Sequence, residues 1–371
     1  MAPGRQTRIL IVEDSAVMRS LLRSVVTSGS GLEVMGTAAD GASALLFLDS
    51  YAPDLILLDV EMPVMNGLDT LRQLRRQGHK MPVIMCSSLT KSGAKVTIEA
   101  LAGGASDYVA KPAGQSSREE AIQALGQELL PKIHALTGSA PAPTVLPPAR
   151  PVQSVPAPES QPNVLTPSVV VIGVSTGGPA ALDVLLPALP AGFPLPVLVV
   201  QHMPEVFTGL LAQRLNHRCQ LQVREAAEGE TVQRGAVLIA RGGWHMEVLG
   251  SGRSGAPSTI HLNQDPPENH CRPAVDVLFR SAAKVYGAGV LGVVLTGMGS
   301  DGLVGSRLIR SQGGSVLAQD QATSTVWGMP GAVAQAGVAN KVLPLAAIAP
   351  EIARIANRSA SQERSRARMV V

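Results

Sequence analysis

Short runs of apolar residues alternate with longer amphipathic stretches along most of this 371-residue chain. In the first 136 residues, five apolar runs have the length of a strand, and the intervals between them have helical spacing. We predict strands at 8–13, 32–38, 54–60, 81–87 and 106–110, and a closing helix at 118–136. Because these strands are apolar throughout, they indicate a parallel sheet with helices on both faces.

The same alternation returns after residue 167. Strand-length apolar runs occupy 168–174, 196–201, 220–225, 236–240, 289–296 and 315–318, and a short antiparallel pair fits 245–249 and 259–263. The sequence therefore predicts an α/β protein with two doubly wound parallel-sheet domains. The first is expected to be flavodoxin-like, and the second to be Rossmann-like with a small antiparallel hairpin.

Proline dominates the segment between the two alternating regions, which has neither helical nor strand periodicity. Such a composition is typical of an extended, semi-rigid linker. A ligand for an SH3-type domain is the alternative, but clustered PxxP motifs with basic flanks are missing. We expect a first domain at 1–136, a linker at 137–166, a second domain at 167–358 and a basic tail at 359–371.

Composition and charge narrow the classes of partner and compartment. The formal charge of +3 is too small to predict a nucleic-acid or membrane-surface partner, and the excess of arginine lies in the tail. No apolar run approaches the length of a membrane span. The cysteines are odd in number and lack CxxC spacing, so we expect a reducing, cytoplasmic compartment and buried free thiols. They are Cys86, Cys219 and Cys271.

Polar side chains stand at the carboxyl ends of the first five predicted strands, where open parallel sheets bind ligands. They are Glu13, Asp14, Asp59, Ser87 and Lys111. The carboxylates could hold Mg²⁺, and Asp59 could attack a phosphoryl group whose oxygens Lys111 and Ser87 would neutralise. Any one of these residues could instead cap a helix. Five of them at successive strand ends favour a phosphoryl-transfer site.

Four segments of this domain resemble the receiver domain of two-component response regulators, namely ILIVEDSAVMR, LILLDVEMPVMNGLD, PVIMCSSLT and DYVAKP. The resemblance covers residues 7–136. It implies that Asp59 is the phospho-acceptor and that Glu13 and Asp14 join it in binding Mg²⁺. It further implies a switch hydroxyl at Ser87, a rotating aromatic at Tyr108 and the site lysine at Lys111.

An apolar strand of the second domain runs into the sequence GVSTGGP at 173–179. Residues 173–177 fit G-x-S-x-G, a pattern in which a sharp strand-to-helix turn exposes a nucleophilic serine. The lysine of a phosphate-binding P-loop is missing. Two interpretations of the motif remain, a nucleophilic Ser175 and a glycine-rich turn in which Ser175 caps the helix.

A nucleophilic serine needs a histidine as base and an acid that orients the histidine. His202 ends the predicted neighbour of the Ser175 strand, and Asp301 follows a third strand. All three side chains are therefore expected at one edge of the sheet. Their order in the chain differs from that of α/β-hydrolases, but a triad is defined by geometry rather than order.

Two other interpretations concern the same loops. Residues 297–302 are a literal G-x-G-x-x-G with Asp320 further on, as in a dinucleotide site. Asp301 inside that loop would repel a pyrophosphate, and too little chain follows to complete the nucleotide-binding unit. A zinc site is the other alternative, formed by His245, His270 and Cys271, which lack the usual ligand spacing.

Six segments of the second domain resemble the catalytic domain of CheB-type chemotaxis methylesterases: VVVIGVSTGGPAAL, VLVVQHMP, IARGGWHMEV, CRPAVDVLFRSAA, GVVLTGMGSDG and TSTVWGMPGAV. The resemblance implies hydrolysis of glutamate γ-methyl esters on chemoreceptors during adaptation, and deamidation of receptor glutamines as a second reaction. The implied catalytic residues are Ser175, His202 and Asp301, with the backbone N–H groups of Thr176 and Met298 as the oxyanion hole.

The order of receiver, linker and catalytic domain also matches whole proteins of that family. It implies that the unphosphorylated receiver covers the active site, that phosphorylation of Asp59 by a chemotaxis histidine kinase uncovers it, and that methylated chemoreceptors are the substrate. We expect Mg²⁺ for phosphorylation, no cofactor for ester hydrolysis, a monomer, no nucleic-acid partner, and membrane contact through receptors alone. A DNA-binding response regulator competes, but the second half lacks a helix-turn-helix pattern.

Overall fold

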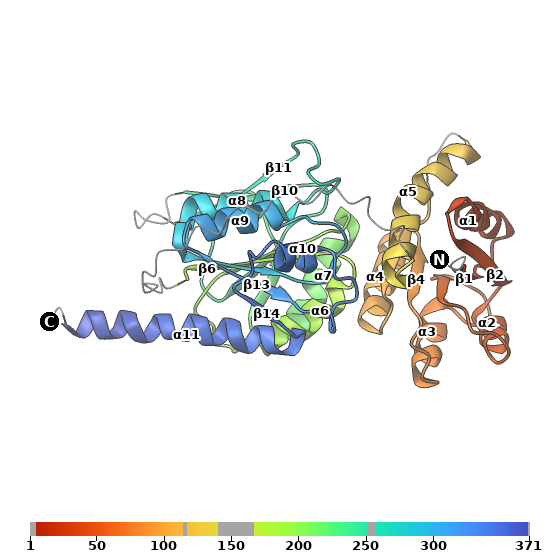
Figure 1. Ribbon diagram of the computed structural model, residues 1–371, viewed down its shortest axis with the longest axis horizontal. Coiled ribbons are helices and arrows are strands. Elements are labelled where there is room, and N and C mark those ends of the chain that lie inside the picture. Colours follow the sequence, from red (N-terminus) through yellow and green to blue (C-terminus); the bar gives the residue numbers. More distant parts are fainter. Residues whose placement is uncertain (1–4, 114–116, 140–166, 251–256, 370–371) are drawn as a thin grey trace.

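The computed structural model describes residues 5–113, 117–139, 167–250 and 257–369, with the side chains of the last helix described up to residue 357. Two α/β domains lie one beyond the other along the long axis of the molecule, with the first 139 residues at one end (Figure 1). Most of the predicted linker, residues 140–166, lies outside the described residues.

The first domain is built on a five-stranded parallel sheet in the order β2-β1-β3-β4-β5, which is the flavodoxin-like order. All five predicted strands are present. They are β1 (Thr7–Val12), β2 (Leu32–Ala38), β3 (Leu55–Asp59), β4 (Val83–Ser87) and β5 (Asp107–Ala110). The helices are α1 (Ala16–Ser28), α2 (Gly41–Leu48), α3 (Gly67–Arg76), α4 (Lys91–Ala102) and α5 (Arg118–Thr137).

The second domain holds a seven-stranded sheet in the order β14-β13-β12-β6-β7-β9-β8 and a separate antiparallel pair, β10 with β11. The sheet strands are β6 (Val169–Val174), β7 (Val197–Gln201), β8 (Gln222–Glu225), β9 (Ala236–Ile239), β12 (Val290–Val294), β13 (Ser315–Gln319) and β14 (Lys341–Leu343). The pair is β10 (His245–Leu249) and β11 (Thr259–Asn263). All strands predicted here are present, and β14 is an additional edge strand.

Six α-helices and two short 3₁₀ helices are described in the second domain. They are α6 (Gly178–Leu185), η1 (Leu186–Ala188), α7 (Glu205–Arg218), α8 (Val275–Tyr286), η2 (Gly287–Gly289), α9 (Leu303–Ser311), α10 (Met329–Gln335) and α11 (Leu345–Met369). Helices cover both faces of each parallel sheet, so the central strands β3 and β6 are buried along their whole length.

Most helices of the first domain begin at a side chain that caps the helix. The N-caps of α1, α3 and α4 are Ser15, Asn66 and Thr90, whose side-chain oxygens each accept a backbone N–H of the first turn. These caps leave the carboxylates of Asp14 and Asp59 without a capping role. The interpretation of the strand-end acids as ordinary helix caps is therefore wrong for these two residues.

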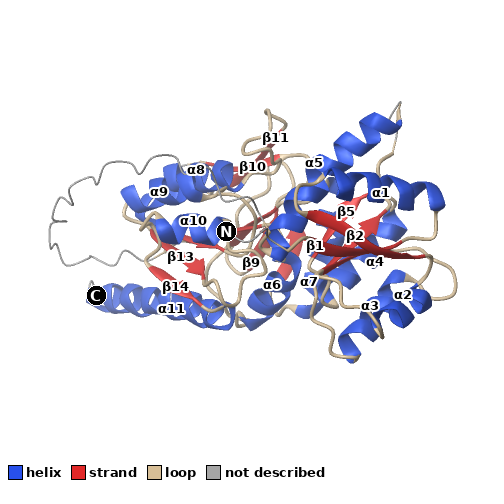
Figure 2. Ribbon diagram, turned by 45° about the vertical axis from the view of Figure 1, so that its right-hand side comes forward, coloured by secondary structure: helices blue, strands red, loops and turns tan. Residues whose placement is uncertain are grey.

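The two domains pack against each other through α4 of the first and α6 and α7 of the second, and Tyr108 of β5 also contacts α7 (Figures 1 and 2). The ring of Tyr108 lies against that of Phe207, with 4.5 Å between their centroids. The Lys132 ammonium lies 5.0 Å from the Tyr108 centroid and donates a 2.5 Å hydrogen bond to the Tyr108 carbonyl. The contact of Tyr108 with Phe207 thus joins the two domains, and Lys132 holds Tyr108 from within the first domain.

Three further expectations are answered by the fold. Helix α11 continues through residues 359–369, the predicted tail, and projects from the domain (Figure 1). Cys86 is buried, but Cys219 and Cys271 are partly exposed, so the prediction that all three thiols are buried is wrong for two of them. In the described part of the chain, no helix combines the length and apolar character needed to span a membrane.

Candidate active site

The strand β6 lies between β12 and β7 in the second sheet, and all three run in parallel. Gly173 pairs with Val294 on one side, and Val174 pairs with Gln201 on the other. The segments that follow these strands therefore leave the same edge of the sheet, and they carry Ser175, His202 and Asp301. The predicted neighbourhood of the three strands is confirmed.

Ser175 lies in a sharp turn between β6 and α6. The N-cap of α6 is Gly177, which has a left-handed φ of 76° and provides no side-chain cap, so Ser175 does not cap this helix. The Ser175 N–H donates to the Thr296 carbonyl at 3.0 Å. A Cβ on Gly297 would lie only 2.8 Å from the Ser175 Cβ, so the loop after β12 can approach the serine only because residue 297 is glycine.

His202 is held by a contact at each ring nitrogen. Nε2 lies 2.8 Å from Asp301 Oδ2, and Nδ1 lies 3.5 Å from Cys271 Sγ. Burial disfavours the imidazolium, but the hydrogen bonds to Asp301 and Cys271 outweigh it and raise the pKa of His202 to about 9. Since a carboxylate only accepts hydrogen bonds, Nε2 carries a proton and Nδ1 is the nitrogen that could act as base.

Asp301 is 2% exposed, and its two oxygens accept several hydrogen bonds. Oδ2 accepts from His202 and from the Val275 N–H at 2.7 Å, and Oδ1 accepts from the Asp276 and Gly302 N–H groups, both at 2.9 Å. Burial alone would raise the pKa of Asp301, but His202 and these N–H groups lower it below its ordinary value. The carboxylate is therefore ionised and fixed beside the imidazole.

Two residues that the sequence analysis did not single out support Asp301. Asn269 donates from Nδ2 to Asp301 Oδ1 at 2.9 Å and to Asp276 Oδ2 at 3.2 Å, and its φ of 53° is unusual for a residue other than glycine. Asp276 is 1% exposed, and burial, with a smaller effect of the Asp301 charge, raises its pKa to about 6. Both residues lie in the polar, proline-flanked segment PPENHCRPAVD at 266–276, which leads into α8.

The two competing interpretations of these loops find no support in the contacts. A pyrophosphate bound by residues 297–302 would lie at the N-terminus of α9, but carboxylates already accept N–H groups there: Asp301 Oδ1 accepts the Gly302 N–H and Asp276 Oδ1 accepts the Gly305 N–H. His245 is engaged at both nitrogens, because Nδ1 accepts the Ala274 N–H and Nε2 lies 3.2 Å from the Pro266 carbonyl. His245 thus anchors the loop that carries Cys271.

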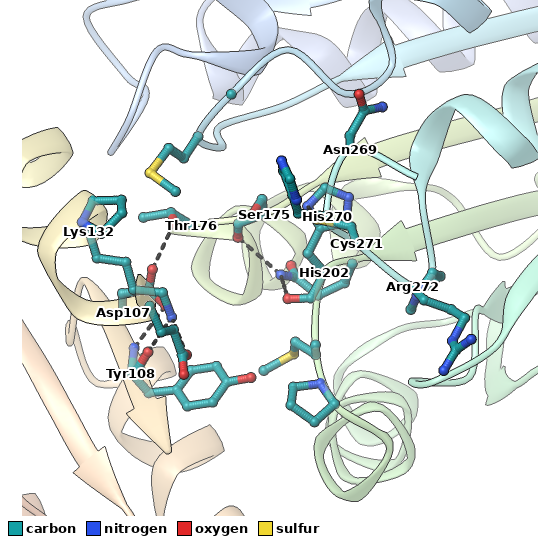
Figure 3. Close-up of a pocket in the computed structure, with 18 of the residues that line it drawn as sticks. Asp107, Tyr108, Lys132, Ser175, Thr176, His202, Asn269, His270, Cys271 and Arg272 are labelled. Carbon is teal, nitrogen blue, oxygen red and sulfur yellow. Dashed lines mark hydrogen bonds and ion pairs between the residues drawn. The ribbon is translucent and has the colours of Figure 1, made fainter. Parts of the chain in front are cut away.

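A cavity of about 800 Å³ opens beside these residues, and both domains line it (Figure 3). Ser175, His202, His270 and Met298 contribute from the second domain, while Tyr108, Lys132 and other residues of β5 and α5 contribute from the first. Met298 is 37% exposed, whereas Thr176 is 5% exposed beneath the first domain. The first domain therefore forms one wall of the candidate site.

A direct hydrogen bond joins the first domain to the residue after Ser175. The Thr176 hydroxyl donates to Asp107 Oδ2 at 2.7 Å, and both side chains are buried (Figure 3). Asp107 Oδ1 also accepts the Tyr108 N–H and lies 3.6 Å from Lys132 Nζ. Asp107 was not predicted as a site residue, because its contact depends on how two domains dock.

The first domain brings its predicted acidic residues together at the carboxyl edge of its own sheet. Oxygen atoms of Glu13, Asp14 and Asp59 lie within 4.8 Å of one another. Lys111 Nζ lies 2.7 Å from Asp59 Oδ1 and 3.0 Å from Glu13 Oε2. Asp59 Oδ2 is buried and accepts no hydrogen bond from a described residue. Burial, and then repulsion by Asp59, raises the pKa of Glu13 to about 7. Three clustered carboxylates, one with a buried oxygen that accepts no hydrogen bond from a described residue, fit a hard cation, which prefers oxygen ligands.

The other two predicted residues of this domain are both buried. Ser87 Oγ accepts a 2.7 Å hydrogen bond from Thr97 Oγ1 and donates to the Ser88 carbonyl. Tyr108 points toward the second domain and packs on Phe207, as described above. Tyr108, which contacts the other domain, thus lies on β5, and Lys111 lies just past the end of the same strand.

Comparison with known proteins gives the same division of the chain. A family model described as "CheB methylesterase" matches residues 170–352, and one described as "Response regulator receiver domain" matches residues 9–123. A protein of Trichodesmium erythraeum named "Protein-glutamate methylesterase/protein-glutamine glutaminase" is 47% identical over 354 residues, which cover 94% of this chain and 98% of that protein.

A protein of the same name from Nocardioides sp. is 48% identical over 353 residues, with 94% of each chain covered. Among solved structures, the CheB methylesterase catalytic domain of Thermotoga maritima is similar at 41% identity and a TM-score of 0.49. That comparison covers 52% of this chain and all of the Thermotoga domain.

The environment of His202 predicts its titration. We expect the imidazole to titrate near pH 9, and we expect both Asp301→Asn and Cys271→Ala to lower this pKa, since the contacts with both residues raise it. Nitrogen-15 NMR of the histidine side chains measures both changes. A wild-type His202 that titrates below the ordinary value of about 6.5 would contradict the described contacts.

Proposed function

Since the chain belongs to the CheB methylesterase family and carries a response regulator receiver domain, we propose that it hydrolyses glutamate γ-methyl esters of chemoreceptors under the control of phosphorylation. Deamidation of receptor glutamines is the second proposed reaction, and adaptation in chemotaxis is the proposed role. The observation that carries the proposal is the meeting of Ser175, His202 and Asp301 at adjacent strand ends, with 2.8 Å between His202 and Asp301.

The proposed reaction starts with an attack by Ser175 Oγ on the ester carbonyl carbon. His202 accepts the hydroxyl proton at Nδ1, because Nε2 donates its proton to Asp301. The tetrahedral intermediate then collapses, the bond to the methoxy oxygen breaks, and His202 returns the proton so that methanol leaves. Ser175 is left as an acyl ester of the glutamate side chain.

Water completes the cycle. It attacks the acyl carbon while His202 accepts its proton, and the glutamate carboxylate and the Ser175 hydroxyl are released. With a glutamine substrate, the leaving group of the first step is ammonia instead of methanol. The backbone N–H groups of Thr176 and Met298, next to Ser175 and Gly297, are the proposed oxyanion hole, and a single donor of this kind contributes about 3 kcal/mol.

The described structure supports a covered, inactive arrangement. The first domain walls the cavity and bonds Thr176, so a receptor helix has no access to Ser175. We propose that movement of the first domain opens the cavity to the substrate.

The proposed trigger is transfer of a phosphoryl group from a chemotaxis histidine kinase to Asp59. Glu13, Asp14 and Asp59 would hold Mg²⁺, whose positive charge would neutralise phosphoryl oxygens. Lys111 is placed to contact the phosphoryl group, and Ser87 to donate a hydrogen bond to it once it leaves Thr97. A shift of β5 and Tyr108 would then disturb the packing on Phe207. We further propose that the protein acts as a monomer in a reducing cytoplasm.

Removal of the proposed nucleophile provides the first test. We expect Ser175→Ala to lower the rate of methanol release from methylated receptor membranes by about 10⁶-fold, to the background level. Ser311→Ala, on the surface helix α9, is the matched control and should retain the wild-type rate. Methanol release by Ser175→Ala at the wild-type rate would exclude Ser175 as nucleophile.

The phospho-acceptor is tested with a small radiolabelled phosphodonor such as acetyl phosphate. Asp59→Asn should take up no label, because the attacking carboxylate oxygen is lost, and Asp69→Asn should label like the wild type since Asp69 is exposed and pairs with Arg72. Chelation of Mg²⁺ should also stop labelling. Label that persists on Asp59→Asn would place the acceptor elsewhere.

The contact between the domains predicts the basal activity of the unphosphorylated chain. Asp107→Ala removes the acceptor of the Thr176 hydroxyl. A hydrogen bond to a charged group contributes about 1.5 kcal/mol, which corresponds to about a tenfold rise in uncovered molecules and in methanol release. Asp69→Ala is the control. Basal activity that is unchanged in a folded Asp107→Ala variant would contradict the proposed covering role.

A further inference from the structure

The side-chain amide of Gln201 connects the backbones of the proposed nucleophile and the proposed base. Gln201 is the last residue of β7 and is 2% exposed. Its Nε2 donates to the Ser175 carbonyl at 3.0 Å and to the His202 carbonyl at 3.3 Å. One NH₂ group thus bridges two residues that are 27 positions apart in the chain.

The position of Gln201 explains why such a bridge is needed. The pairing of β6 with β7 ends at Val174 and Gln201, and the His202 N–H bonds the Val174 carbonyl just beyond it at 3.1 Å. After that bond the two chains separate, since one turns into α6 and the other into the loop before α7. The Gln201 side chain extends the pairing by one step, to Ser175 and His202 themselves.

The glycine-rich turn is shaped around this side chain. A Cβ at Gly178 would lie 2.0 Å from Gln201 Oε1, so residue 178 can only be glycine while Gln201 holds this position. Gln201 Oε1 is buried and accepts no hydrogen bond from a described residue. The amide therefore hydrogen-bonds through its N–H donors, while its oxygen packs against Gly178.

We propose that Gln201 is a positioning residue of the esterase reaction, which fixes the separation of Ser175 and His202. The proposal rests on the roles proposed for those two residues, and Gln201 itself touches neither substrate nor reacting atoms. A glutamine suits this task because it offers two hydrogens on one nitrogen to two carbonyl oxygens. Small displacements of reacting groups cost about 100-fold in rate, so loss of the bridge should lower kcat.

The test uses the full chain phosphorylated by acetyl phosphate and methanol release from methylated receptor membranes. Gln201→Met keeps the length of the side chain and removes both donors. We expect kcat to fall by about 100-fold and KM to change by less than about twofold, because the bridge aligns Ser175 and His202 without binding substrate. Asn216→Ala, which removes an amide contact to the Val223 N–H away from the site, is the control for a general loss of stability.

A second variant provides a pH dependence of kcat that would be absent if Gln201 merely stabilised the fold. Gln201→Glu has the same shape but donates no hydrogen when ionised and one when protonated. The ratio of its kcat to that of Gln201→Met should therefore rise as the pH falls from 8 to 5.5. A carboxylate at position 201 also shifts the pKa of the adjacent His202, so the titration of His202 is measured in both variants by nitrogen-15 NMR and its effect on each kcat is removed before the ratio is taken.

The outcomes separate this proposal from the proposed function. A wild-type kcat in Gln201→Met, or a ratio that does not change with pH, overturns the positioning role even where Ser175→Ala is inactive. Full methanol release by Ser175→Ala instead overturns the proposed function. If Gln201→Met fails to fold, the pH profile of Gln201→Glu is read against that of the wild type, and parallel profiles overturn the proposal.

Discussion

The buried carboxylate of Asp301 is the interaction on which the proposed catalytic edge depends. It accepts hydrogen bonds from the loops after β7 and β11, from the start of α8 and from its own loop after β12. Removal of this acceptor would leave several buried donors unpaired, and each such donor costs about 1–3 kcal/mol. The same carboxylate therefore orients His202 and joins three segments that are distant in sequence, at residues 202, 269–276 and 301–302. Asn269 donates its hydrogen bond to Asp301 from a left-handed backbone conformation that few residues other than glycine adopt.

The sequence was sufficient for most features that follow from local pattern. Uniformly apolar runs identified the strands, and strand ends identified the acidic residues around Asp59 and the edge that carries Ser175, His202 and Asp301. These residues could be predicted because a parallel sheet brings the carboxyl ends of neighbouring strands together. The strand β14 escaped prediction because it has only three residues, which are largely exposed, and Pro344 follows it directly.

The remaining site residues could not be found from pattern alone, for reasons that differ between them. Gln201 and Asn269 act through amide hydrogen bonds to atoms brought close by folding, and an isolated amide in a sequence has no spacing to recognise. Cys271 was considered as a zinc ligand, whereas its thiol faces His202. Asp107 begins an ordinary strand, and its bond to Thr176 exists only because two separately folded domains dock.

The strand β5 links the two sites of the molecule. Asp107 at its start bonds Thr176, and Lys111 just past its end contacts Asp59, so one four-residue strand of about 13 Å connects them. Coupling through such an element is reciprocal, because a free energy that links two equilibria acts equally on both. If phosphorylation of Asp59 favours release of the first domain, then a receptor segment that displaces this domain must favour the phosphorylated form to the same extent. The substrate would then be an effector of the receiver, and the esterase would be most readily phosphorylated where its receptors are.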